Sequence, residues 1–247
     1  MKHLMQNKLS GFSLIELIVV IIILGVLAVA TSTFINFGTQ IYTETTARDQ
    51  LVSSARFAIE RLNRELRNAL PNSLRLTSSN QCLEFTPIIE STIYTDIPVA
   101  PETARDNINV IKFDEAFDSN WRVIVYPLVP DDVYPLISSN NDKVHSVDSI
   151  VATGDEWVIT LENDVVFAED SPTQRMYFVN GSVKYCLQNN VLTRNGTIMA
   201  QDIYNTNPFD VIASTLQRNA MVQVHFRFEK NSEQVTFNNE VQVLNVP

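Results

Sequence analysis

The sequence has few of the residues on which catalysis and metal binding usually depend. It contains three histidines and two cysteines among 247 residues. It lacks the Gly-x-Ser-x-Gly, His-Glu-x-x-His, Cys-x-x-Cys and phosphate-loop motifs. His145 lies in a polar segment and His225 on the polar side of an expected strand, while acidic pairs such as Asp131-Asp132 lack EF-hand spacing. We therefore expect no catalytic residue, no metal site and no cofactor.

Positive charge is scarce over most of the chain. Residues 1–75 carry eight basic and five acidic side chains, whereas residues 76–247 carry ten basic and 23 acidic ones. A body this acidic repels phosphate backbones, so we expect no nucleic-acid partner. The whole chain is 45% hydrophobic and 19% charged, which excludes a collagenous, low-complexity or wholly disordered protein.

A long run without charge lies near the N-terminus. It extends from Leu17 to Ala30, and the next charge is Glu44. The segment Leu14–Phe34 is long enough to span a hydrocarbon core of ~30 Å. Lys2 and Lys8 precede it, so the positive-inside rule places the first ten residues in the cytoplasm and most of the chain across the membrane. These features alone fit a cleaved secretory signal, a plain membrane anchor or a buried helix.

Glu16 separates these alternatives. It lies near the start of the apolar stretch, where a carboxylate costs roughly 2.5–3.5 kcal/mol on insertion scales. A signal peptide or a plain anchor gains nothing from this charge. We therefore expect Glu16 to have a function and a cationic partner.

The residues around Glu16 carry a family resemblance. The segment KLSGFSLIEL, which ends at Leu17, resembles the type IV prepilin motif. In that family a membrane peptidase cuts after the glycine and methylates the new amine. The resemblance implies cleavage between Gly11 and Phe12, N-methylation of Phe12, and neutralisation of that amine by Glu16 of the same or a neighbouring chain. Such a chain is a structural subunit and no enzyme. Its implied partners are the prepilin peptidase and methyltransferase, major and other minor pilins, and the inner-membrane assembly platform.

A periodic segment follows the apolar run. One helix face carries nine apolar residues at helical spacing, and the opposite face carries four possible i,i+4 ion pairs. The apolar residues are Phe37, Ile41, Leu51, Ala55, Ala58, Ile59, Leu62, Leu66 and Ala69; the pairs are Glu44–Arg48, Arg56–Glu60, Glu60–Arg64 and Arg61–Glu65. Pro71 ends the pattern, so we expect a helix from Phe12 to Leu70 with Gly38 as a weak point.

The rest of the chain has the period of two that is typical of strands. We expect strands near residues 82–89, 110–113, 121–126, 156–161, 176–179, 182–186, 191–194, 222–228, 235–237 and 240–243. Asn180-Gly181 predicts a two-residue hairpin, and Asn189-Asn190, Asn195-Gly196 and Asn238-Asn239 predict further turns. Residues 127–155 have little pattern and are expected to form a long loop region. The expected fold class is α+β, with a pilin-like long helix packed on a mainly antiparallel sheet.

This pattern divides the chain into four expected parts. They are a cleaved leader at residues 1–11, a transmembrane and assembly helix at 12–35, an amphipathic helix at 36–70 and a β-rich domain at 71–247. The β-rich domain is expected in the periplasm and then on the pilus at the cell surface. Cys82 and Cys186 there suggest a disulfide, with two buried free thiols as the alternative.

Two later segments resemble particular subfamilies of these prepilins. Residues 55–73, and residues 183–187 with 192–194, look like the O-type minor pilin of the mannose-sensitive haemagglutinin (MSHA) pilus. They are also similar to the J-type pseudopilin of type II secretion. A membrane-anchored periplasmic enzyme or sensor remains the alternative from another class.

Overall fold

The computed structural model describes residues 13–113, 118–134, 143–154, 156–215, 218–231 and 233–243. The chain divides between Asp49 and Gln50 into two units, which are described separately. The elements in chain order are α1 (Leu14–Arg67), β1 (Arg75–Thr77), β2 (Cys82–Phe85), β3 (Glu90–Asp96), β4 (Arg105–Ile111), β5 (Arg122–Val125), the 3₁₀ turn η1 (Pro130–Asp132), β6 (Val144–Thr153), β7 (Glu156–Val165), β8 (Arg175–Val179), β9 (Val183–Gln188), β10 (Val191–Arg194), β11 (Thr197–Ala200), β12 (Phe209–Ile212), β13 (Ala220–Lys230) and β14 (Glu233–Val243). This confirms the α+β class, with one long N-terminal helix and mostly antiparallel sheets.

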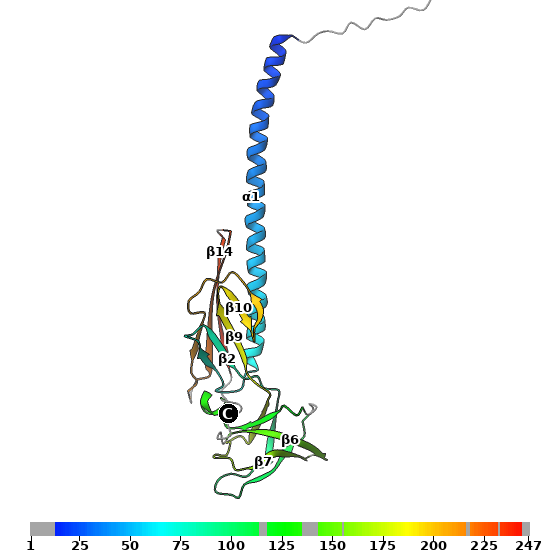
Figure 1. The fold of residues 1–247 in the computed structure, drawn as a ribbon, viewed down its shortest axis with the longest axis vertical. Helices are drawn as coiled ribbons and strands as arrows, with labels where there is room; N and C mark the ends of the chain where they lie inside the picture. The colour runs from blue at the N-terminus through cyan, green and yellow to red at the C-terminus, as the bar shows by residue number, and fades with distance from the viewer. Residues whose placement is uncertain are drawn as a thin grey trace, which may run out of the picture. The chain divides into compact units, whose positions relative to one another are not determined.

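The helix α1 is continuous over 54 residues (Figure 1). It passes through Gly25 and Gly38 without a break, because no proline interrupts the i to i−4 ladder. Two threonine side chains near the end of its apolar stretch are hydrogen bonded within the helix. The Thr33 hydroxyl donates to the Val29 carbonyl at 3.0 Å, and the Thr31 hydroxyl donates to that of Leu27. These two hydroxyls therefore find acceptors within the helix itself.

The helix ends three residues earlier than expected, at Arg67 rather than Leu70. The Leu70 N–H donates to the Thr86 carbonyl at 2.8 Å, and the Ile88 N–H donates to the Asn68 carbonyl at 2.9 Å. These bonds to a distant segment replace the last helical turn. Pro71 favours the change, since the residue before a proline is disfavoured in the helical conformation.

The apolar stripe of the second unit is buried as expected. Leu51, Ala55, Ala58, Leu62, Leu66 and Ala69 are all at most 4% exposed. Most of the predicted ion pairs on the opposite face do not form. Of the four expected pairs only Arg61–Glu65 forms, at 3.0 Å, and Glu44 instead accepts a hydrogen bond from Gln40. An exposed pair gains little free energy and costs side-chain entropy, so spacing alone does not secure it.

Two antiparallel sheets share one core with the second part of α1. A five-stranded sheet has the order β1-β2-β9-β10-β11, and a three-stranded sheet has the order β12-β13-β14. Inward residues of both sheets join the helix stripe in one cluster, which includes Phe85, Tyr185 and Phe226. Figure 1 shows β2, β9 and β10 beside α1.

A second substructure is a closed six-stranded barrel with the order β3-β4-β7-β6-β5-β8. Its interior is filled by apolar residues from its own strands and loops, with Trp121, Phe113 and Phe178 in mutual ring contact. The sequence did not indicate a barrel, since closure depends on strand pairings between residues far apart in the chain.

Two of the turn predictions are wrong. Asn180-Gly181 does not form a hairpin, because β8 pairs with β3 and β5 while β9 pairs with β2 and β10. Neither residue has the positive φ that a tight hairpin turn requires. Asn238-Asn239 lies inside the continuous strand β14.

The turns at Asn189-Asn190 and Asn195-Gly196 are confirmed. They connect β9 with β10 and β10 with β11. All four residues have positive φ, from 47° to 81°, which suits the tight turns of two-residue hairpins.

The expected loop region 127–155 contains the ten-residue strand β6. A register shift between Val147 and Ser149 interrupts its pairing with β7. Val147 and Ile150 both pack into the barrel core although they are three residues apart. The irregularity therefore hides the period of two by which a strand is recognised.

Candidate functional site

The candidate assembly site begins at the first turn of α1. The Glu16 N–H donates to the Ser13 carbonyl at 3.1 Å and to the Ser13 hydroxyl at 3.3 Å, and the Leu17 N–H donates to the same carbonyl at 3.2 Å. Ser13 thus caps the helix and satisfies N–H groups that have no partner inside it. Sequence analysis missed this role, although Ser-x-x-Glu before an apolar run is the sequence signature of such a cap.

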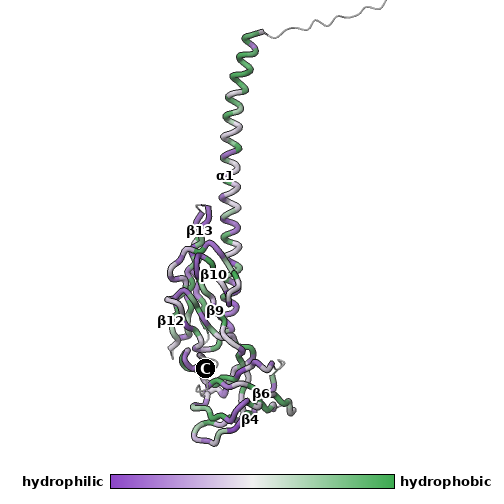
Figure 2. The backbone as a smooth tube through the Cα atoms, in the orientation of Figure 1, coloured by the Kyte–Doolittle hydropathy of each residue, from purple (hydrophilic) through white to green (hydrophobic). Residues whose placement is uncertain are grey.

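Glu16 lies in the third position of this helix and is exposed. Large exposed apolar side chains surround it along the helix, beginning with Leu14, Ile15 and Leu17. No other charged residue follows before Glu44. Figure 2 shows the apolar stretch along the first part of α1. The predicted processing residues Gly11 and Phe12 lie outside the described residues.

Within the described residues the structure has one helix long and apolar enough to cross a membrane, and it is α1. No other described residue buries its apolar window. Such a surface requires either lipid or other apolar helices around it.

Residues 6–32 match the family model of the prokaryotic N-terminal methylation motif. This match contains Gly11, Phe12, Ser13 and Glu16 and extends into the exposed apolar part of α1. No curated protein matches the chain, and no solved structure matches it. The motif supports a type IV pilin or pseudopilin-type protein, and it points to a structural subunit rather than an enzyme. It also implies processing by prepilin peptidase and assembly with other pilins, while the apolar helix suggests single-pass anchoring in a membrane.

A half-buried polar cluster around Glu65 joins the end of α1 to the five-stranded sheet. The Glu65 carboxylate accepts hydrogen bonds from Arg61 at 3.0 Å, Tyr185 at 2.9 Å and Arg194 at 2.9 and 3.0 Å. Burial alone would raise the pKa of Glu65, but these donors, Arg194 first among them, bring the pKa below its ordinary value. Burial and the nearby Glu65 carboxylate raise the pKa of Tyr185, so its hydroxyl stays a donor.

A second carboxylate, Glu84, is paired within the same sheet. Arg75 contacts it at 2.9 Å, the Ser182 hydroxyl donates to it at 2.7 Å, and the Lys184 ammonium lies 3.7 Å away. Burial opposes its charge, yet the Ser182 and Arg75 hydrogen bonds bring the pKa of Glu84 below its ordinary value. The contacts around Glu65 and those around Glu84 therefore stabilise the folded body while the two carboxylates are ionised.

Acid is expected to destabilise the body through these two carboxylates. Because their folded-state pKa values are lowered, their stabilisation is present above about pH 5 and is lost as the pH falls below about 4. Glu65→Gln should cost about 2 kcal/mol at pH 7 and should lose less stability between pH 7 and pH 3.5 than the native chain does. Urea unfolding of the full chain in detergent micelles at the two pH values measures both effects.

Glu60→Gln is the matched control for that experiment. Glu60 lies on the same helix, is exposed and has no ion pair within the described residues. It should leave the urea midpoint at pH 7 unchanged. If Glu65→Gln and the native chain lost the same stability between pH 7 and pH 3.5, the ionised Glu65 carboxylate would not be a source of the acid sensitivity.

Cys82 and Cys186 form a disulfide between the paired strands β2 and β9. The two residues are directly opposite in the register, and the bond spans 104 residues of sequence. No free cysteine remains. The alternative of two buried thiols does not apply in this structure.

The two histidines within the described residues have structural neighbours. His225 is exposed on β13 and is hydrogen bonded to Asn238 at 3.0 Å, as its place on the polar side predicted. His145 contacts the edge of the Phe167 ring at 4.9 Å between centroids. In the part of the chain that the structure describes, no group of three or more His, Cys, Asp or Glu side chains is placed to hold a metal ion.

Proposed function

We propose that this chain is a minor subunit of a type IV pilus of the MSHA kind, which joins the fibre or primes its assembly. The observation that carries the proposal is the methylation motif at residues 6–32, which leads directly into a helix with one acid in its apolar stretch. The processing step is cleavage between Gly11 and Phe12, followed by N-methylation of Phe12.

The charge of Glu16 gives this processing a physical purpose. Cleavage after Gly11 creates an amine on Phe12, four residues before Glu16 in the sequence. The carboxylate of one subunit neutralises the amine of its neighbour, so two isolated charges in an apolar environment become one pair. Leaving one member of a buried pair without the other costs on the order of 3–5 kcal/mol. The pair therefore favours apolar helices that are packed in register over single helices in lipid.

The narrower MSHA assignment is supported by the two segments that resemble the O-type minor pilin. One contains Glu65 near the end of α1, and the other contains Tyr185 and Arg194 on β9 and β10. Glu65 accepts hydrogen bonds from both of these side chains. The resemblance therefore covers a single packed unit and not two unrelated stretches.

The proposed location follows from the same features. Residues 1–11 form the leader on the cytoplasmic side, residues 12–35 cross the inner membrane, and residues 36–70 and 71–247 lie in the periplasm before assembly. The partners are then the prepilin peptidase, the inner-membrane assembly platform and the major and other minor pilins. After assembly the body lies on the fibre at the cell surface.

Fibre fractionation tests this proposal. Pili are sheared from cells that carry an epitope-tagged chain, and the fibre and membrane fractions are compared by quantitative immunoblotting. We expect the tagged chain in the sheared fibres at low copy number, and we expect it to vanish from them in cells without prepilin peptidase. A chain that stays wholly in the membrane fraction of piliated cells contradicts the proposal.

A further inference from the structure

The barrel is inserted between two neighbouring strands of the five-stranded sheet. The chain leaves the sheet at Phe85 on β2 and re-enters it at Val183 on β9, and these two residues are directly opposite in the register. At the start of the barrel Glu90 on β3 is opposite Phe178 on β8. The entry and exit of the barrel are therefore adjacent, as they are at the end of a hairpin. We call residues 86–182 the barrel insert.

The barrel insert has its own hydrophobic core. Every described residue of the core around Trp121, Ile159 and Phe178 lies between positions 94 and 178. The core shared by α1 and the two sheets contains no residue between 86 and 182. No described strand of the barrel pairs with a strand outside it. Each part thus buries its apolar surface without strands from the other.

The contact between the two parts involves the segment that follows α1. The Tyr134 hydroxyl donates to the Ser73 carbonyl at 2.9 Å, and the Arg75 guanidinium lies 3.7 Å from the Tyr134 ring centroid. The backbone bonds from Leu70 to Thr86 and from Ile88 to Asn68, described above, also join the two parts. Leu70 is the one residue from outside the insert in the small cluster that includes Tyr134. The Asn72 amide adds a hydrogen bond to the Pro127 carbonyl at 2.9 Å.

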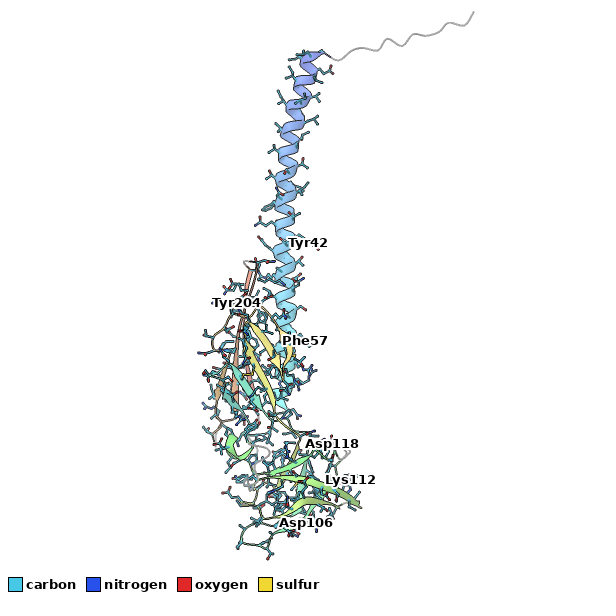
Figure 3. All side chains as sticks on the ribbon, in the orientation of Figure 1. Tyr42, Phe57, Asp106, Lys112, Asp118 and Tyr204 are labelled. Atoms are coloured by element: carbon cyan, nitrogen blue, oxygen red, sulfur yellow. A yellow bond between two sulfur atoms is a disulfide. The ribbon has the colours of Figure 1, made fainter. Side chains whose placement is uncertain are left out.

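Charge is divided along the same boundary. Residues 86–182 contain 17 acidic and five basic side chains, a net charge of −12. Residues 12–85 and 183–247 together contain 11 acidic and 11 basic ones, a net charge of zero. Asp106, Lys112 and Asp118, labelled in Figure 3, belong to the insert, and all three carry charges next to or on its strands. A neutral part can pack closely against copies of itself or similar subunits, whereas a charge of −12 opposes such packing.

We propose that the barrel insert is a separately folding module that the protein displays, and that residues 12–85 and 183–247 carry processing, anchoring and assembly without it. The second half of this statement rests on the proposed function, whereas the first half does not. The adjacent ends, the separate cores and the segregated charge each support the division.

Thermal unfolding of the full chain in detergent micelles tests separate folding. The two tryptophans of the sequence, Trp121 and Trp157, both lie in the barrel insert, so their fluorescence follows the barrel alone. Ile159→Ala alters the barrel core and Leu62→Ala alters the other core, and both residues are fully buried. Ile159→Ala should lower the fluorescence midpoint by about 8 °C or more, and Leu62→Ala should leave it within about 2 °C of the native value. Equal shifts from both variants would show one cooperative unit and overturn the proposal.

Excision of the barrel insert tests whether residues 12–85 and 183–247 assemble without it. In this variant a two-residue Asn-Gly linker connects Phe85 to Val183, and the substitution Leu70→Gln removes the apolar surface that excision uncovers. We expect the chain to retain the Cys82–Cys186 disulfide, to be processed like the native chain, and to reach sheared fibres within about twofold of its level. Degradation of the variant, or its exclusion from fibres that accept the native chain, would show that assembly requires the barrel insert and would overturn this half of the proposal. If the native chain is itself absent from fibres, the proposed function fails. The thermal unfolding experiment still shows whether the barrel insert folds separately.

Discussion

Glu16→Ala is expected to reduce recovery of the chain in sheared fibres by about 10²-fold or more, while its amount in the membrane stays the same. The fibre is expected to lose the pairing of Glu16 with a neighbour's amine, which leaves that amine uncompensated among apolar helices. A loss of 3–5 kcal/mol corresponds to roughly 10²-fold to 4 × 10³-fold in an equilibrium constant. In the membrane the same substitution removes a costly carboxylate from the apolar stretch, so insertion does not suffer. Quantitative immunoblotting of fibre and membrane fractions measures both effects.

Two control variants separate charge from helix capping. Ser13→Ala removes the hydroxyl that accepts the Glu16 N–H and should cost about 1 kcal/mol of helix stability, with recovery reduced far less than by Glu16→Ala. Glu44→Ala removes the next acid along the same helix, which is hydrogen bonded to Gln40, and should leave recovery unchanged. If Glu16→Ala reaches the fibres at native levels, Glu16 does not pair with a neighbour's amine.

The second large effect concerns the disulfide. Replacing Cys82 and Cys186 together by alanine should lower the free energy of unfolding of the body by about 4 kcal/mol. The bond links residues 104 positions apart, and in the loop-entropy account closure of ~100 residues stabilises by about 4.7 kcal/mol. For a body of this size the melting temperature should fall by roughly 8–16 °C. Calorimetry of the full chain in detergent micelles measures the shift.

A reducing agent provides the matched control for this prediction. It should bring the native chain close to the melting temperature of the double variant, and it should not change the variant further. Both cysteines are replaced together, so no single thiol remains to form bonds between chains. A double variant that melts within about 2 °C of the native chain would show that the bond between β2 and β9 does not stabilise the body.

Sequence analysis predicted the parts of the fold that depend on local patterns. The buried helix stripe from Leu51 to Leu66 follows from helical spacing. The turns at residues 189–190 and 195–196 follow from residues that tolerate positive φ. The exposed apolar helix with its single early acid followed from composition. Ser13 was missed although its capping signature is local.

The errors concern information that the local pattern does not contain. Asn180-Gly181 has the composition of a hairpin turn, but strand pairings with β2 and β3, some 90 residues earlier, decide that β8 and β9 lie in different substructures. The Asn238-Asn239 error could have been avoided, since alternation continues through it from Val235 to Val243. Asn239 breaks the apolar side of that strand because its amide donates to the Asn63 side chain of α1 at 2.6 Å.

The mass of the N-terminal peptide of the mature chain, measured on protein from membranes and fibres, tests the central claim most directly. The account predicts a chain that begins at Phe12 with one methyl group on its amine, and a precursor that still carries residues 1–11 in cells without prepilin peptidase. A mature chain that retains residues 1–11 in cells with active peptidase, or one that begins after Ala30, would contradict it.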